Sequence, residues 1–190
     1  DWYQIYPANI LGGKKLTYYV VAKRNQAIGG TTIFTGLQSG QNDTTGGSFI
    51  AFHEGDGSYM ESWRLGEKSR IVPHPGNNVP YVASSIFNGS INTSYLNGKA
   101  YPSVGSGDTF YIDYLFIGAR YSNGICCLYN GSIGEILVFD TDLSVQDRYI
   151  VDNYLGGKWG ITMDTDGDGV DNAKDLYPTD NTMIILSLIH

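Results

Sequence analysis

The chain is poor in cysteine and in long apolar segments. It has two cysteines in 190 residues, and these two, Cys126 and Cys127, are adjacent. Neighbouring cysteines cannot cross-link distant parts of a fold, and no CxxC or Cys/His spacing typical of a zinc site occurs. Two interpretations stay open. The cysteines are either two half-buried thiols at the edge of a strand or a strained vicinal disulfide formed in an oxidising compartment. No apolar run reaches membrane-spanning length, so we expect no membrane insertion.

Basic residues are also scarce. The chain has 12 Lys and Arg against 19 Asp and Glu, a formal net charge of −7. Binding to nucleic acid requires clustered Lys and Arg that neutralise phosphates, so this class of partner is excluded. The acidic balance is compatible with cation binding. The chain begins abruptly at Asp1 without a signal peptide, and we expect it to be a monomeric module cut from a larger protein.

Signatures of catalysis are absent as well. The sequence has no GxSxG turn, HExxH helix or phosphate-binding glycine loop. Glycoside hydrolysis needs two carboxyl groups that face one cleft. Glu54, Asp56 and Glu61 could converge in this way, but turns and edge strands accumulate such residues. His53 and His74 are expected on a sheet face and in a loop, so we predict that the chain is not an enzyme.

What the chain does have is the composition of a turn-rich β protein. Glycine (25) and tyrosine (15) are abundant, whereas only 16% of residues are charged. Runs rich in β-branched and aromatic residues, separated by turn residues, predict a two-sheet antiparallel sandwich. Asn-Gly pairs at 88–89, 97–98, 123–124 and 130–131 predict tight hairpin turns. The predicted strands are 2–6, 16–23, 31–35, 48–53, 59–65, 81–87, 91–96, 110–118 and 132–139.

A short helix is predicted directly after the last of these strands, which itself reads as buried. Ser144 and Asp147 have the spacing of a capping box at a helix start. Leu155 and Trp159 recur on one apolar face, so we expect both to be buried against a sheet. The glycines at 156–157 are expected to end the helix in a left-handed conformation.

The stretch 131–161, GSIGEILVFDTDLSVQDRYIVDNYLGGKWGI, resembles the closing strand and helix of bacterial laminin-G-like jelly-roll domains. These belong to the concanavalin A-like lectin/glucanase superfamily, and LTYYVVAKRN at 16–25 and SYLNGKAY at 94–101 agree with it. The resemblance implies an all-β jelly-roll sandwich over residues 1–161. It does not fix function, since lectins, adhesion modules, hydrolases and lyases share this fold. Hydrolases of the superfamily carry an E-x-D-x-x-E strand, and here Glu135 stands alone.

After residue 161 the sequence becomes rich in aspartate. Alternating carboxylates separated by small residues let a short loop curl around a hard cation, and Gly169 lies where the loop must turn. This pattern resembles the calcium loops of thrombospondin type 3 repeats and dockerins, and the other reading is an acidic linker. We therefore predict a Ca²⁺-binding repeat at 162–181, followed at 182–190 by an apolar tail at a truncation boundary. The expected ligands are Asp164, Asp166, Asp168, the Val170 carbonyl, Asn172 (through water) and Asp175.

Aromatic residues exceed what a core requires, and their flat faces can stack on sugar rings. Loops held by a rigid scaffold carry binding residues, so 38–47, 72–80 and 121–127 are predicted as a recognition rim. The aromatic residues predicted to contact a ligand are Tyr59, Trp63, Tyr81, Tyr95, Tyr101 and Tyr121.

Two functional hypotheses follow from the sequence. The first is a non-catalytic carbohydrate-binding or adhesion module of a large secreted or surface bacterial protein, which binds polysaccharide or cell-surface glycan. The second is a structural spacer or protein-binding domain of the same fold without a sugar ligand. A glycan array with and without calcium separates the two.

Overall fold

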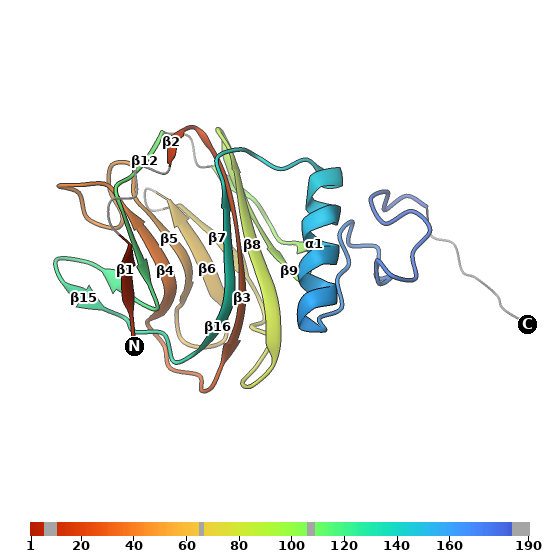
Figure 1. The fold of residues 1–190 in the computed structure, drawn as a ribbon, viewed down its shortest axis with the longest axis horizontal. Helices are drawn as coiled ribbons and strands as arrows, with labels where there is room; N and C mark the ends of the chain where they lie inside the picture. Colours follow the sequence, from red (N-terminus) through yellow and green to blue (C-terminus); the bar gives the residue numbers. More distant parts are fainter. Residues whose placement is uncertain (6–10, 65–66, 106–108, 184–190) are drawn as a thin grey trace, which may run out of the picture.

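Two antiparallel sheets face one another in the computed structural model, which describes residues 1–5, 11–64, 67–105 and 109–183 (Figure 1). This arrangement confirms the predicted all-β jelly-roll sandwich. Sheet 1 contains, in spatial order, β1 (Tyr3–Ile5), β13 (Tyr114–Ile117), β4 (Thr31–Leu37), β5 (Phe49–Glu54), β6 (Met60–Arg64) and β7 (Glu67–Ile71). Sheet 2 contains β10 (Lys99–Ala100), β9 (Ile91–Leu96), β8 (Pro80–Asn88), β3 (Lys15–Arg24) and β16 (Gly131–Phe139), with β11 (Val104–Gly105) also paired to β9.

Two small two-stranded sheets complete the described strands: β2 (Leu11–Gly13) pairs with β12 (Phe110–Ile112), and β14 (Arg120–Tyr121) forms a hairpin with β15 (Ile125–Cys126). A bend at Asp113 interrupts the extended backbone. The single strand predicted over 110–118 is therefore two strands, which belong to different sheets. Strand β7 was not predicted, because its sequence EKSRI is mostly polar. Of the four Asn-Gly pairs, 130–131 is not a turn, since Gly131 begins β16 and pairs with Arg24.

Strand β3 holds the two layers of the core together. Its side chains alternate, so Tyr18 and Val20 point between the sheets while Tyr19 and Val21 point to the outer face of sheet 2. Tyr18 lies 5.2 Å from the rings of both Phe34 and Phe49 on sheet 1. Because both faces are covered, the strand from Leu16 to Ala22 is buried throughout.

Strand β16 lies at the edge of sheet 2, where it pairs with β3 alone. Its residues are half-buried or exposed, so the expectation of a buried strand is wrong. Its apolar residues still serve both layers: Ile133 and Ile136 pack toward the core between the sheets, and Leu137 packs toward the helix side. A bulge between Ile133 and Glu135 interrupts the pairing.

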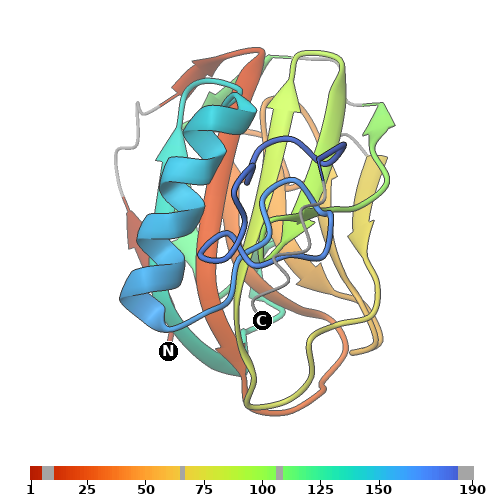
Figure 2. The same cartoon turned by 90° about the vertical axis from the view of Figure 1, so that its right-hand side faces the viewer.

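The helix α1 (Val145–Trp159) covers the outer face of sheet 2 (Figures 1 and 2). Ser144 and Asp147 form the predicted capping box. The helix ends at Gly160, whose φ is 66°, rather than at the predicted Gly156–Gly157 pair. Gly156 is needed for packing, since a Cβ there would lie 2.7 Å from the Met163 side chain. In the described part of the chain, no helix is both long and apolar enough to cross a bilayer.

The segment after α1 lies against sheet 2 beside the helix (Figure 2). Ile161 and Met163 join Leu155 in the apolar layer between sheet 2 and the helix. The Asp164 amide donates to the Asn97 carbonyl in the β9–β10 turn, at 2.9 Å. Packing therefore continues past the predicted boundary at residue 161, and of the predicted tail, residues 184–190 lie outside the described residues.

Candidate functional site

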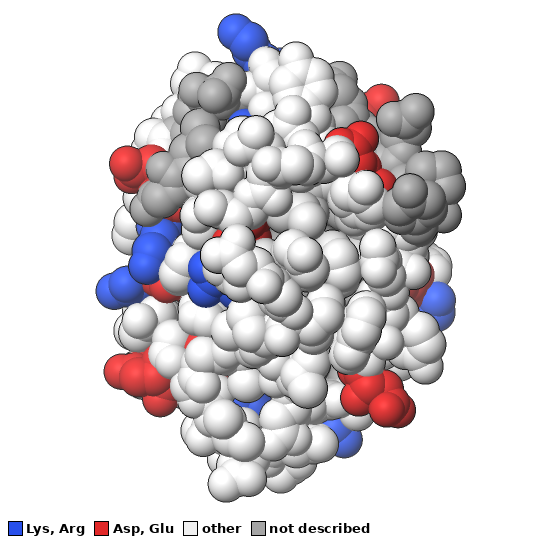
Figure 3. Space-filling view, turned by 90° about the vertical axis from the view of Figure 1, so that its left-hand side faces the viewer, with Lys and Arg blue, Asp and Glu red and all other residues white. Residues whose placement is uncertain are grey.

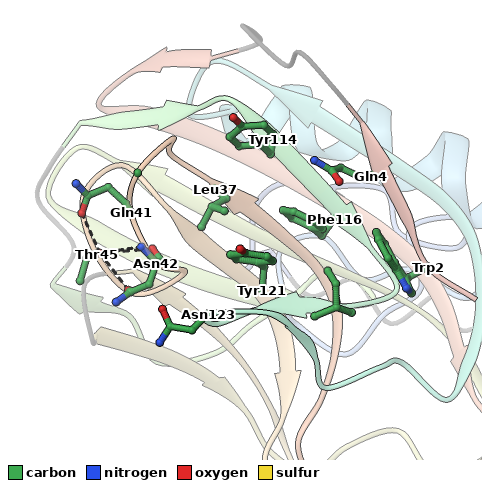
Figure 4. Close-up of a pocket in the computed structure, with 12 residues that line it drawn as sticks. Trp2, Gln4, Leu37, Gln41, Asn42, Thr45, Tyr114, Phe116, Tyr121 and Asn123 are labelled. Atoms are coloured by element: carbon green, nitrogen blue, oxygen red, sulfur yellow. Dashed lines mark hydrogen bonds between the residues drawn. The ribbon is translucent and has the colours of Figure 1, made fainter.

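A groove of about 750 Å³ opens on the outer face of sheet 1, opposite the helix (Figures 3 and 4). Figure 3 shows that most of this face is uncharged, with most charged side chains toward its edges and a few blue and red atoms visible nearer its middle. Strand β13 supplies its floor, because Leu115 points into the core and Tyr114 and Phe116 point outward. The groove is lined by Trp2, Gln4, Leu37, Gly40, Gln41, Asn42, Thr45, Tyr114, Phe116, Tyr121, Asn123 and Ile125.

The aromatic residues of the groove form a row across the sheet (Figure 4). Tyr121 stacks on Phe116 with ring centroids 5.1 Å apart and planes 19° apart. The Trp2 ring lies 6.2 Å from Phe116 and is tilted by 38°. Phe116 is buried, whereas Trp2 remains 41% exposed. The row therefore presents apolar ring surface to solvent on a base that packing holds in place.

Amide side chains surround this row. Gln41, Asn42 and Asn123 lie at one end of it, and Gln4 lies near Trp2 at the other (Figure 4). The Thr45 hydroxyl lies 3.1 Å from Gln41 Oε1 and 3.0 Å from Asn42 Oδ1, and fixes both amides. Among the described residues, the side chains of Gln4 and Asn123 have no hydrogen-bond partner. The groove thus combines apolar rings with neutral hydrogen-bonding groups.

A buried ion pair joins the two loops that form one end of the groove. Arg120, at the start of the β14–β15 hairpin, pairs with Asp43, which is 1% exposed in the 38–48 loop. The Thr32 amide on β4 donates to the Cys127 carbonyl at 2.8 Å and fixes the hairpin from its other strand. Two of the three predicted rim loops, 38–47 and 121–127, are therefore brought together at one site.

The third loop, 72–80, does not line this groove. It is fixed by buried polar contacts: Asn77 Oδ1 accepts from Arg24 Nε at 2.9 Å, and His74 Nε2 lies 3.2 Å from Glu54 Oε1. Its role in the described structure is to cover one end of the core.

Of the six aromatic residues predicted to contact a ligand, the structure places Tyr121 alone in the groove. The prediction for Tyr81 is wrong, because this residue is fully buried and its hydroxyl is bonded to that of Tyr129 at 3.1 Å. The other four lie apart from the groove and are covered by neighbouring side chains. Tyr59 lies under Arg70 at 4.2 Å, Trp63 under Lys68 at 3.8 Å, Tyr95 under Arg148 at 3.9 Å, and Tyr101 packs against the core.

Sequence reasoning missed Trp2, Tyr114 and Phe116, which are three of the four aromatic residues among the described lining residues. Tyr114 and Phe116 alternate along β13 with Leu115 and Ile117, which pack on the core, and this two-residue period was the signal that could have found them. It was hidden because 110–118 was read as one continuous strand.

The carboxylates considered for catalysis do not converge in the described structure. Glu54 is buried and pairs with Arg24 at 3.3 Å, whereas Glu61 is buried and pairs with Arg70 at 2.9 Å. In the register of β5 and β6, Glu61 is opposite His53 and Glu54 is opposite Met60, so their side chains point to opposite faces of sheet 1. Both carboxylates therefore form ion pairs with arginine side chains of other strands.

Cys126 ends β15 and Cys127 directly follows it, and both are free, half-buried thiols. Their sulfur atoms are 3.1 Å apart. Burial raises the pKa of the Cys127 thiol to about 11, so the reactive thiolate is scarce at neutral pH.

A second candidate site lies in the Asp-rich segment beside the helix. One carboxylate oxygen from each of Asp164, Asp166 and Asp168 lies within 4.8 Å of the others. The Asp164 carboxylate accepts hydrogen bonds from the backbone amides of Gly167 and Gly169, and these bonds close the loop. Burial raises the pKa of Asp166, and the nearby Asp168, Asp175 and Asp164 carboxylates raise it further. Four negative side chains therefore crowd one loop.

Three oxygens of this loop have no hydrogen-bond partner among the described residues although they are shielded from solvent: Asp166 Oδ2, Asp168 Oδ2 and Asp175 Oδ2. Each of these aspartates uses its other oxygen to accept a backbone amide, from Asp168, Val170 and Tyr177 respectively. Buried carboxylate oxygens without a partner are unfavourable, so this loop fits a hard cation.

Asn172, a predicted ligand, also has a structural role. Its Oδ1 accepts from the Thr165 amide at 2.9 Å, and its Nδ2 donates to the Thr165 hydroxyl at 2.8 Å. The Thr165 hydroxyl donates in turn to Asp152 on the helix, also at 2.8 Å. The Asn172 side chain therefore fixes the loop on the helix, and its role as a ligand through water stays a prediction.

No protein-family model matches the chain, and no curated protein matches it in sequence. Solved structures do resemble it. The CBM40 domain of the Ruminococcus gnavus IT-sialidase, solved with α2,3-sialyllactose, is 12% identical, and the match covers 79% of this chain and 97% of that one with a TM-score of 0.60. Domain 4 of an extracellular GH43 arabinanase from Geobacillus stearothermophilus, solved with arabinotriose, is 12% identical over 74% and 67% of the two chains, with a TM-score of 0.56.

Domains LG4–5 of the mouse laminin α1 chain are 17% identical, and the match covers 70% of this chain but 37% of that one, with a TM-score of 0.52. Identities this low establish a shared fold and nothing finer. The chain has the jelly-roll fold found in carbohydrate-binding and laminin-G-like domains.

Proposed function

We propose that this chain is a non-catalytic carbohydrate-binding module of a secreted or cell-surface protein, and that the groove on sheet 1 is its binding site. The observation that carries the proposal is the row of Trp2, Phe116 and Tyr121 bordered by amide side chains. Aromatic faces cover the apolar C–H faces of sugar rings, while amides hydrogen-bond with hydroxyl groups. The volume of about 750 Å³ lies within the usual range for ligand sites, about 300–1,000 Å³.

The fold and the composition support this proposal. Two structural neighbours are carbohydrate-binding domains attached to glycosidases, solved with sugars bound. The described carboxylates Glu54 and Glu61 are neutralised by Arg and Lys on opposite faces of a sheet, which favours binding over hydrolysis. We propose further that the module acts as a monomer within a larger chain.

We also propose that the Asp-rich loop binds Ca²⁺. The direct ligands would be Asp164, Asp166, Asp168, Asp175 and the Val170 carbonyl, with Asn172 contributing through water. Three shielded carboxylate oxygens without a partner support this assignment. Calcium accepts six to eight oxygens with flexible geometry, whereas zinc prefers nitrogen and sulfur. The cation would neutralise the loop and stabilise its attachment to the helix.

A glycan array tests the proposed function, with binding to any hit then measured by calorimetry. Tyr121→Ala and Trp2→Ala should each raise the dissociation constant at least about fivefold, since truncating an aromatic anchor costs more than about 1 kcal/mol. Tyr154→Ala is the matched control, because Tyr154 is 49% exposed on the helix at the other side of the molecule. If no glycan binds, or if binding survives both groove substitutions, the spacer or protein-binding alternative replaces this proposal.

A further inference from the structure

We infer that the groove selects neutral glycans and rejects acidic ones such as sialylated or uronate-containing chains. This inference rests on the proposed function and specifies its ligand class. It is drawn from the charges around the groove, since all twelve lining residues have uncharged side chains. Among the described lining residues, a glycan carboxylate would meet aromatic rings and neutral amides but no Lys, Arg or His.

Arg120, the cation nearest to the lining residues in sequence, already forms an ion pair. Arg120 precedes Tyr121, but its guanidinium pairs with Asp43 and also lies 5.0 Å from the Trp63 ring, which does not line the groove. Asp43 is 1% exposed and already neutralises Arg120, so a ligand carboxylate would meet an ion pair without net charge and not a free cation. The ion pair therefore holds the two loops of the groove together but provides no free positive charge for a ligand.

The other exposed cations on the described part of sheet 1 lie on β7 and do not line the groove. Lys68 and Arg70 on β7 both pair with Glu61, at 3.3 and 2.9 Å. The carboxylate Asp113, between β12 and β13, accepts the Ser39 amide at 2.7 Å at the base of the 38–48 loop, and it adds negative charge to this region.

An acidic glycan would consequently bind more weakly than a neutral one. Its carboxylate would give up water for neutral donors alone, which compensate an ionised group poorly. The net charge of −7 adds long-range repulsion, which salt screens over about 8 Å at physiological ionic strength. Neutral hydroxyls have no such cost, and the amides of Gln4 and Asn123 are available to pair with them.

Affinity gel electrophoresis of the whole chain tests the inference. The gels would contain a neutral polysaccharide (arabinan, galactan, xyloglucan or glucomannan), an acidic one (polygalacturonate or alginate), or polygalacturonate whose carboxyl groups have been reduced. We expect retardation by at least one neutral polysaccharide. We expect at least about tenfold weaker binding to polygalacturonate than to its carboxyl-reduced form, with a difference that shrinks in high salt.

The Tyr121→Ala variant separates the two levels of the proposal. If acidic chains bind as well as neutral ones and Tyr121→Ala abolishes both, the groove is a glycan site but the inferred selectivity is wrong. If no polysaccharide retards the chain, or if retardation survives Tyr121→Ala, the proposed function fails and the inference fails with it. Asn123→Lys adds a positive test, because a cation in the groove should improve binding to polygalacturonate at least about threefold over the parent chain.

Discussion

The indole N–H of Trp159 donates to the carboxylate of Glu135 at 2.9 Å, and joins the end of the helix to the edge strand β16. The indole ring lies over Gly134, where a Cβ would be 2.7 Å from it. Lys158 pairs with the same carboxylate at 3.0 Å. Trp159 is nevertheless 39% exposed, so its expected burial is wrong, whereas that of Leu155 is confirmed at 0%. Glu135 thus has a structural role.

Trp159→Ala should therefore cost about 1–2 kcal/mol in the free energy of unfolding, below the roughly 3–5 kcal/mol of a fully buried tryptophan. Leu155→Ala, from the same helix but fully buried, should cost about 2–5 kcal/mol. Urea unfolding monitored by circular dichroism measures both. Equal losses for the two variants would contradict the half-buried position of Trp159.

The buried carboxyl of Asp152 predicts a pH dependence. Burial raises the pKa of Asp152 to about 6 from an ordinary 3.8, despite the hydrogen bond from Thr165. The folded state thus holds this proton more tightly than the unfolded chain. Its stabilising contribution is complete below about pH 4 and is lost as the pH rises through 6.

Asp152→Asn keeps an acceptor for Thr165 but does not titrate. Relative to the parent, this variant should gain stability between pH 4 and pH 7.5, by up to about 3 kcal/mol. Thermal melts of both chains across this range, in EDTA, provide the measurement. A stability difference that stays constant with pH would show that Asp152 is not strained by its burial.

Calcium binding should depend on Asp168 and not on Asp171. Asp168→Asn replaces the unpartnered Oδ2 by an amide and should weaken Ca²⁺ binding at least about tenfold. Asp171→Asn is the matched control, because Asp171 caps the Ala173 amide in the same loop and lies outside the carboxylate cluster. Titration calorimetry should give a parent dissociation constant on the order of 10⁻⁴–10⁻³ M. Equal affinities for the two variants would refute the assignment.

The attachment of the Asp-rich segment should depend on Gly98. A Cβ at Gly98 would lie 2.4 Å from the Asp164 carbonyl oxygen, and its φ is +91°. Gly98→Ala should therefore loosen the segment and speed tryptic cleavage at the exposed Lys174. Gly89→Ala is the control, since Gly89 has a φ of +95° but a Cβ there would meet only Lys14, at 3.5 Å. Equal cleavage rates in both variants would mean that Gly98 does not hold the segment.

Local patterns in the sequence predicted much of this fold. The strand 91–96 was predicted with its observed bounds, and the capping box of Ser144 and Asp147 was predicted together with its helix. Both depend on interactions between residues close in the chain, such as turn conformation and the pairing of cap groups. Where a residue's environment is set by distant segments, prediction was weaker. The edge position of β16 and the exposure of Trp159 follow from strand order, which the local pattern does not contain.

The candidate groove shows the same limit. The loops 38–47 and 121–127 were identified separately as rim candidates, but their meeting depends on the ion pair between Asp43 and Arg120, 77 residues apart. Aromatic type alone favoured Tyr81, which the fold buries, and overlooked Trp2, which β1 brings beside β13. The Asp-rich cluster was easier to predict, because its carboxylates lie within one short loop.

The most direct test of the central claim is a nuclear magnetic resonance titration of the ¹⁵N-labelled chain. The probe would be an oligosaccharide of whichever neutral polysaccharide retards the chain most strongly. The side-chain amide signals of Gln4, Asn42 and Asn123 should shift together with the Trp2 indole signal. The amides of Asn97 and Asn172, on the helix side of the molecule, should not move. Shifts confined to the helix side, or no shifts at saturating probe, would contradict a glycan site on sheet 1.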